Sequence, residues 1–180
     1  MGMNTWFALL RGINVGGTGI LPMKDLVATL EELGLSGVKT YIQSGNAVFQ
    51  SPESKSPALA KKIADSIATQ HGFRPHVLVL SHKELSQAVT RNPFPDAEVE
   101  PKTLHLFFLA DVPANPDLGA LNVIKSDSER FVLDKRVFYL HAPDGIGRSK
   151  LATRAEKLLG VAATARNWRS VEKILEMATH

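Results

Sequence analysis

The sequence contains no cysteine. This absence excludes disulfide bonds, thiolate-bound zinc, iron–sulfur clusters and cysteine nucleophiles, and it is typical of a reducing, cytoplasmic location. No apolar run approaches the roughly 20 residues that span a bilayer, and no basic segment precedes an apolar run at the N-terminus. We therefore expect a cytoplasmic protein without membrane contact.

The sequence also has little excess of one charge over the other, because it contains 21 Lys and Arg residues and 18 Asp and Glu residues. The resulting net charge of +3 is too small to indicate nucleic-acid binding by itself. Between Arg148 and Lys173, however, seven basic residues accompany only two acidic ones. This basic segment, 148–173, keeps nucleic acid as an alternative partner.

The six histidines are scattered, with no H-x-x-x-H pair and no neighbouring carboxylate cluster. Metal sites require ligands at short, regular spacings. We therefore predict neither a metal site nor a cofactor.

Apolar periodicity and turn residues predict an α+β protein with two halves. The first half reads as strand 5–10, a helix from Pro22 to Gly34, strands 38–43 and 47–50, a helix over 59–72, strand 77–80 and a short helix over 83–89. This order is the βαββαβ pattern of a ferredoxin-like sandwich. The predicted domain is 1–92, and a linker over 92–96 ends it.

The second half, 97–180, repeats part of this order. It reads as strand 104–109, a short helix over 116–123, a hairpin of strands 130–133 and 137–141, a helix through 151–159 and a last helix that opens at 166–169. The predicted fold class is therefore two ferredoxin-like α/β sandwich halves with mainly antiparallel sheets.

Polar and glycine residues gather where two predicted strands end. In a βαββαβ sheet the end of the first strand and the turn between the second and third strands lie at the same edge. Backbone N–H groups of glycines and a forked guanidinium suit an anion there. The candidate ligand-binding residues are Arg11, Asn14, Gly16, Gly17, Lys24, Gln43, Ser44 and Asn46. The structural alternative is that these residues only turn and bridge the chain.

A second candidate anion site precedes the helix over 151–159. Two glycines, a serine suited to cap the helix and two cations occur there, namely Gly145, Gly147, Arg148, Ser149 and Lys150. Helix N-termini favour anions, but the spacing matches neither the Walker loop nor the dinucleotide fingerprint. A glycine turn followed by a capped helix is the alternative.

A third set of residues offers a possible contact with nucleic acid. Trp168 lies among Arg166, Asn167 and Arg169, where its ring would stack on a base. The alternative, which we favour, is that Trp168 packs in the core.

The motifs ALLRGINVGG, the Pro-Met-Lys helix start and YIQSGN resemble the bacterial family known as domain of unknown function 1697. The segments GIGRSKL and TARNWRSVEKILEMA resemble the ending of the same family. The resemblance spans nearly the whole chain, and it implies a fold more firmly than a function.

Our first functional hypothesis is a module that binds a small anionic or phosphate-bearing ligand at 11–17 and 43–46. One alternative is an enzyme on the same site, in which Arg11 or Lys24 stabilises charge. The other alternative is nucleic-acid binding through 148–173.

Overall fold

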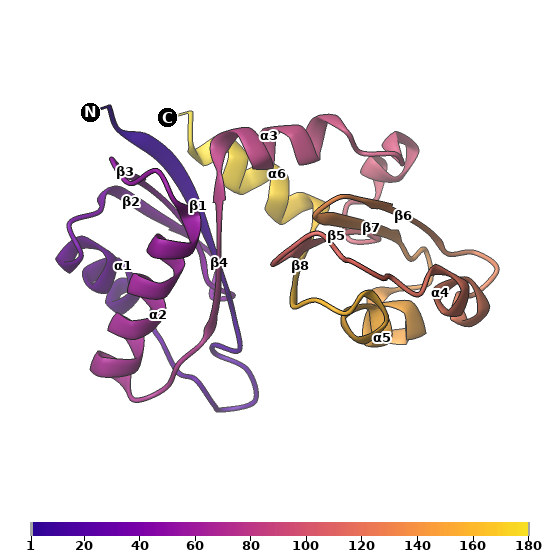
Figure 1. The fold of residues 1–180 in the computed structure, drawn as a ribbon, viewed down its shortest axis with the longest axis horizontal. Coiled ribbons are helices and arrows are strands. Elements are labelled where there is room, and N and C mark those ends of the chain that lie inside the picture. Colours follow the sequence, from indigo (N-terminus) through magenta and orange to yellow (C-terminus); the bar gives the residue numbers. More distant parts are fainter. Residues whose placement is uncertain (1, 180) are drawn as a thin grey trace. The chain divides into compact units, whose positions relative to one another are not determined.

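The computed structural model describes residues 2–179. It contains two four-stranded antiparallel sheets, each packed with helices, with the strand orders β2-β3-β1-β4 and β6-β7-β5-β8 (Figure 1). This confirms the predicted α+β class with antiparallel sheets. Tertiary contacts divide the chain into a first unit, which runs to Gln87 and also includes the segment from Glu172 onward, and a second unit, Ala88–Val171. This division assigns 172–179 to the first unit, whereas the domain boundaries expected from the sequence place it in the second.

The first unit has the element order expected from the sequence. Its elements are β1 (Asn4–Arg11), α1 (Met23–Glu32), β2 (Ser36–Tyr41), β3 (Asn46–Ser51), α2 (Ser56–His71) and β4 (His76–Ser81). The next helix, α3 (His82–Thr90), continues into the second unit. β1 pairs antiparallel with β3 on one side and with β4 on the other, so it lies in the middle of its sheet.

The central position of β1 explains its continuous apolar run. Every residue from Trp6 to Leu10 is buried, because both faces of this strand are covered. Helices α1 and α2 lie along one face of the sheet (Figure 1). The core on that face is formed by alternate strand residues and by apolar helix residues, among them Trp6, Ala8, Leu10, Phe49, Leu26, Leu30, Leu59 and Ile63.

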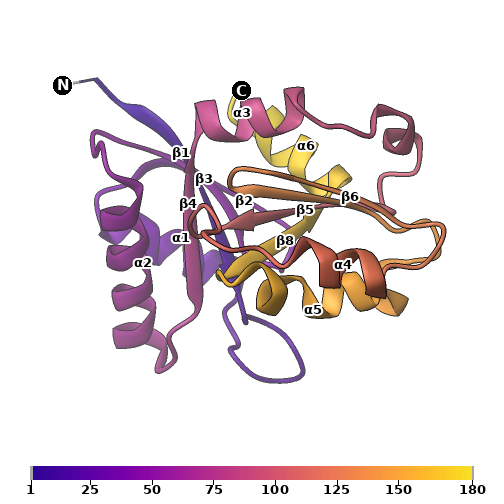
Figure 2. The ribbon, with the colours of Figure 1, turned by 45° about the vertical axis from the view of Figure 1, so that its right-hand side comes forward.

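The second unit repeats the same order completely. Its elements are the 3₁₀ turn η1 (Pro95–Val99), β5 (Leu104–Leu109), α4 (Leu118–Ile124), β6 (Arg130–Asp134), β7 (Val137–His141), the 3₁₀ turn η2 (Ile146–Arg148), α5 (Lys150–Leu159) and β8 (Ala163–Asn167). The last helix, α6 (Trp168–Met177), begins here and ends in the first unit. α4 and α5 lie side by side against one face of the sheet (Figure 2). Their core includes Phe107, Leu109, Phe138, Leu140, Leu121, Leu151, Ala155 and Leu159.

Strand β8 was not expected, and it corrects the prediction that the last helix opens at Arg166. Arg166 and Asn167 belong to β8, and α6 begins at Trp168. β8 forms because β5 is a central strand whose second edge needs a partner, and Leu109 pairs with Ala163 there. Among the described residues, no helix combines the length and apolar character needed to cross a membrane.

Candidate functional site

The loops after β1 and between β2 and β3 meet at one end of the first sheet. Leu9 pairs with Asn46 across the two strands, and the Leu10 amide donates a 2.8 Å hydrogen bond to the carbonyl of Gly45. The Asn14 side chain reaches the Gln43 carbonyl at 2.9 Å. The structure therefore brings the two predicted segments together, as the strand topology requires.

Asn14 holds these loops together. Its Oδ1 accepts the Leu21 amide at 2.8 Å, and its Nδ2 donates to the carbonyls of Leu21 and Gln43, both at 2.9 Å. The residue has a φ of 52°, a left-handed conformation that asparagine tolerates better than most residues. Because its side-chain amide is already hydrogen-bonded to backbone groups, Asn14 has a structural role in stabilising the loops.

Asn46 has a similar supporting role at the start of β3. It is fully buried, and its Nδ2 donates to the Tyr41 carbonyl at 3.1 Å and to Ser44 Oγ at 3.0 Å. These bonds fix the turn between β2 and β3. A ligand in solvent has no access to a side chain that is 0% exposed.

Gly16 and Gly17 form the tip of a small hairpin. Val15 and Thr18 pair as an isolated antiparallel bridge, and the two glycines have φ values of 59° and 76°. Two successive positive φ values are typical of the tight turns that close hairpins. The loop projects beyond the end of the sheet (Figures 1 and 2). Turn geometry therefore accounts for the glycine pair without a ligand.

The remaining candidates of this first set lie on the surface. Arg11, opposite His76 in the sheet, is exposed, as are Lys24, Gln43 and Ser44. Of two cavities in the described residues, one in each unit, neither is lined by any of these residues. Their role as ligands stays a prediction.

The cavity of the second unit coincides with the second candidate site. Its volume is about 550 Å³. Four of the five predicted residues, all except Gly147, contribute to its wall. The complete lining is Val123, Ile124, Lys125, Ser126, Glu129, Asp144, Gly145, Arg148, Ser149 and Lys150.

The β6–β7 hairpin explains why these two segments form one wall. Arg130 pairs with His141, so the residues just before β6 lie beside those just after β7. Ser128 Oγ donates a 2.7 Å hydrogen bond to Asp144 Oδ2 across this gap. Sequence reasoning missed Lys125, Ser126 and Glu129. The available signals were the Ser-x-x-Glu pattern at 126–129 and the position of the predicted hairpin.

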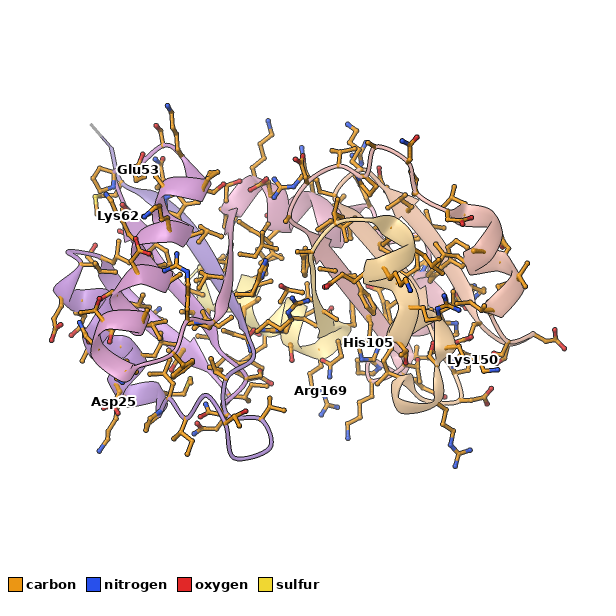
Figure 3. All side chains as sticks on the ribbon, turned by 60° about the horizontal axis from the view of Figure 1, so that its bottom comes forward. Asp25, Glu53, Lys62, His105, Lys150 and Arg169 are labelled. Atoms are coloured by element: carbon orange, nitrogen blue, oxygen red, sulfur yellow. The ribbon has the colours of Figure 1, made fainter. Side chains whose placement is uncertain are left out.

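The start of α5 contributes further residues to the lining. Ser149 has the extended backbone of an N-cap, and its Oγ accepts the Ala152 amide at 3.0 Å. Lys150 is the first residue of this helix (Figure 3). Gly145, with a φ of 102°, turns the chain into the 3₁₀ turn that precedes it. The predicted helix cap is therefore present, and two cations flank it.

The charges of this cavity are mixed, with an excess of cations. Three basic residues, Lys125, Arg148 and Lys150, line it together with the two carboxylates of Glu129 and Asp144. Such a site attracts a negatively charged group at the cationic side.

The cavity of the first unit provides a contrast. It has a volume of about 400 Å³ and lies at the start of α2. Here Glu53 Oε1 accepts the backbone amides of Ser54 and Lys55 at 2.9 and 3.1 Å, and these bonds lower the pKa of the Glu53 carboxyl. Lys62 Nζ lies 3.9 Å from Glu53 Oε2, and both residues are labelled in Figure 3. The protein's own carboxylate thus accepts the backbone amides that immediately precede α2.

The third set of candidates is mainly structural. Trp168 is 1% exposed, so its ring packs in the interior as favoured above and presents no stacking surface. Asn167 Oδ1 accepts the Ser170 amide at 2.9 Å at the start of α6. Burial lowers the pKa of Arg166 to about 10. Only Arg169 is exposed, and its side chain points away from the ribbon in Figure 3.

No group of three or more His, Asp or Glu side chains in residues 2–179 is arranged to hold a metal ion. The candidate sites contain cations, backbone amides and isolated carboxylates.

Comparison with known proteins adds a family to this description. The family model described as "Protein of unknown function (DUF1697)" matches residues 3–139. The chain belongs to this family. The DUF1697 match includes the loops at 11–17 and 43–46 and the cavity segment before β6, and it ends before the start of α5.

A solved structure has the same fold as this DUF1697 chain. It is described as the structure of conserved bacterial protein SP0830 from Streptococcus pneumoniae. The two chains are 22% identical, the TM-score is 0.75, and the alignment covers 98% of this chain and 99% of the other. At this identity the likeness shows the fold alone. No curated protein matches the sequence.

Proposed function

We propose that the protein binds a small anionic ligand, bearing a phosphate or a carboxylate, in the cavity at the start of α5. One observation carries this proposal: Lys125, Arg148 and Lys150 line a single cavity of about 550 Å³. Cavities of roughly 300–1,000 Å³ are typical of small-molecule sites. Several cations around such a space would bind an anion more strongly than an isolated surface charge would.

The helix adds to this attraction. The first amides of an α-helix have no acceptor within the helix, and the helix dipole places partial positive charge at the same end. Ser149 Oγ accepts the Ala152 amide, and within residues 2–179 the amides of Lys150 and Leu151 donate to no acceptor, so they are available to a ligand. Arg148 offers a guanidinium whose paired N–H groups suit two oxygens of one anion.

The loops at 11–17 and 43–46 offer the same chemistry with less support. Arg11 and Lys24 are exposed cations there. Asn14 and Asn46, however, use their side chains to hold the loops, and the glycine pair closes a hairpin. We therefore place the anion site in the second unit and keep the loops as the competing location.

The two other functional classes receive less support from the geometry. The burial of Trp168 removes the stacking group on which a nucleic-acid interface at 148–173 depended. The enzyme hypothesis has less support because neither of the two cavities described above is lined by Arg11 or Lys24. A binding module is the function that the arrangement supports best.

The test is isothermal titration calorimetry with inorganic phosphate and pyrophosphate. We compare the wild type with the double variant Arg148→Ala/Lys150→Ala and with the control Arg154→Ala/Lys157→Ala. The control removes the same charge from exposed positions of the same helix, outside the cavity lining. The proposal predicts at least a tenfold loss of affinity only in the first variant, because hydrogen bonds to charged groups are worth about 1.5–3 kcal/mol each. Equal losses in both variants, or no binding by the wild type, would contradict it.

A further inference from the structure

Glu129 is a buried carboxylate in the same cavity, and only part of its hydrogen-bonding capacity is used. The residue is 5% exposed, and its Oε1 accepts the Ser126 amide at 2.8 Å. In the described chain, 2–179, its second oxygen, Oε2, accepts no hydrogen bond, and it is not one of the buried side-chain atoms without a partner, so it is open to the cavity that Glu129 lines. A carboxylate oxygen that is open to the cavity is available as an acceptor for a donor on a ligand.

The neighbouring cations are not paired with this carboxylate. Arg130, the next residue, donates to Asp96 Oδ2 at 2.8 Å and to His141 Nδ1, so its guanidinium is committed elsewhere. Lys125 Nζ lies 3.4 Å from the Ser126 carbonyl. The other cavity carboxylate, Asp144, already accepts the Ser128 hydroxyl. Glu129 is therefore the one charged acceptor of the cavity lining that is both buried and incompletely bonded.

We infer that the ligand carries an ammonium group as well as its anionic group, and that Glu129 binds the ammonium. This inference rests on the anion site proposed above and narrows the ligand to a zwitterion such as an aminoalkyl phosphate. The anionic group would bind Arg148, Lys150 and the start of α5. The ammonium would donate to Glu129 Oε2 from inside the cavity.

Charge balance supports a zwitterion over a simple phosphate ester. The cavity lining has one more cation than carboxylates. A phosphate monoester has a charge near −2 above pH ~6, and an added ammonium reduces the net charge to about −1, which matches the excess positive charge of the site. A hydroxyl in place of the ammonium would donate a neutral hydrogen bond, which is weaker than the charge-assisted bond from an ammonium.

The test compares three probes of similar size by calorimetry at pH 7.5. They are O-phosphoethanolamine, 2-hydroxyethyl phosphate and ethyl phosphate, which end in an ammonium, a hydroxyl and a methyl group. For the wild type we expect O-phosphoethanolamine to bind at least about tenfold more tightly than either of the others, as a charge-assisted hydrogen bond implies.

The matched variants are Glu129→Gln and Asp127→Asn. Gln keeps an oxygen for the Ser126 amide and removes the charge, while Asp127 is an exposed residue of the same turn outside the cavity lining. The preference for the ammonium probe should fall to threefold or less in Glu129→Gln and persist in Asp127→Asn. Melting temperatures report whether each variant folds. If Glu129→Gln does not fold, the affinities of the wild type for the three probes decide the inference.

The possible failures are distinguishable. If the wild type binds all three probes with equal affinity, or prefers the hydroxyl probe, the inference about Glu129 is overturned while the anion site stands. If the folded wild type binds none of the three, the anion site itself is overturned, and the inference with it.

Discussion

Ser128 and Asp144 form a 2.7 Å hydrogen bond that joins the segment before β6 to the segment after β7. The two residues are sixteen positions apart in the chain. Their contact follows from the hairpin, whose last pair is Arg130 with His141. The register of this hairpin thus determines the position of Glu129 in the cavity lining. The start of α5 determines the position of Lys150.

Substitution of Asn14 should destabilise the first unit and leave anion binding at the cavity of the second unit unchanged. Asn14→Gly keeps the positive φ available but removes three side-chain hydrogen bonds, to Leu21 twice and to Gln43. We expect a loss of about 1–3 kcal/mol in the free energy of unfolding, because backbone groups in a partly buried site lose their partners. Urea unfolding measures this. Gln43→Ala is the control, since Gln43 takes part through its backbone carbonyl, and it should change the stability by less than about 0.5 kcal/mol.

Gly45→Ala should be more harmful than Gly17→Ala. Both positions have positive φ, 85° and 76°. A Cβ at Gly45 would lie 2.8 Å from the side chains of Leu10 and Ile13, whereas a Cβ at Gly17 would meet nothing within 4 Å. Both variants bear the conformational cost of about 1–2 kcal/mol, and only Gly45→Ala adds overpacking of about 1–3 kcal/mol. Equal melting temperatures for the two variants would show that the turn does not pack as described.

Arg11 distinguishes the two candidate locations of the anion site. If the ligand binds at the cavity of the second unit, Arg11→Ala and Arg11→Lys should both leave the affinity for phosphate unchanged. A loss of affinity in both variants with an unchanged melting temperature would instead identify Arg11 as a ligand fork, because lysine cannot reproduce the bidentate geometry. Calorimetry and thermal unfolding of the same samples supply both measurements.

Stability should fall as the pH drops from 7 toward 4, in part because of His105. Burial lowers the pKa of His105 to about 4 from its usual 6.5. The unfolded chain therefore binds a proton between these values that the folded chain does not, so protonation favours unfolding as the pH falls through this window. The full shift corresponds to about 3 kcal/mol.

The variant His105→Leu tests this assignment. Thermal unfolding between pH 7 and pH 4.5 should show a shallower loss of melting temperature than in the wild type. Exposed His82 provides the control, and His82→Gln should keep the wild-type slope. The acidic residues Asp65 and Asp96, whose pKa values are lowered by hydrogen bonds to basic side chains, lose stabilising charge mainly below this window. An identical slope in His105→Leu would refute the role of this histidine.

The sequence is sufficient to predict most of the fold for identifiable reasons. The apolar run of β1 indicates a central strand, and proline at position 22 together with glycine at position 34 bounds α1. The repeated element order predicts two antiparallel sheets. β8 escapes prediction because Ala163–Asn167 is short and lacks β-branched alternation, and it is a strand only because β5 offers an edge.

The candidate site was predictable on one side only. Gly145, Ser149 and Lys150 lie within one short motif that is typical of a helix start, so local chemistry identifies them. Glu129 and Lys125 reach the same cavity through the pairing of β6 with β7, which depends on tertiary register. At 11–17 the residue types that make a hairpin turn are the same as those that make an anion-binding loop. The hydrogen bonds of the Asn14 side chain to Leu21 and Gln43, which only the structure reveals, favour the structural role.

The most direct measurement is a ¹H–¹⁵N NMR titration of the full chain with inorganic phosphate, with the backbone amides assigned. The proposed site predicts saturable shift changes concentrated in residues 123–129 and 144–152. Changes concentrated in 11–17 and 43–46, or no saturable change at all, would contradict the conclusion that the cavity at the start of α5 is the anion site.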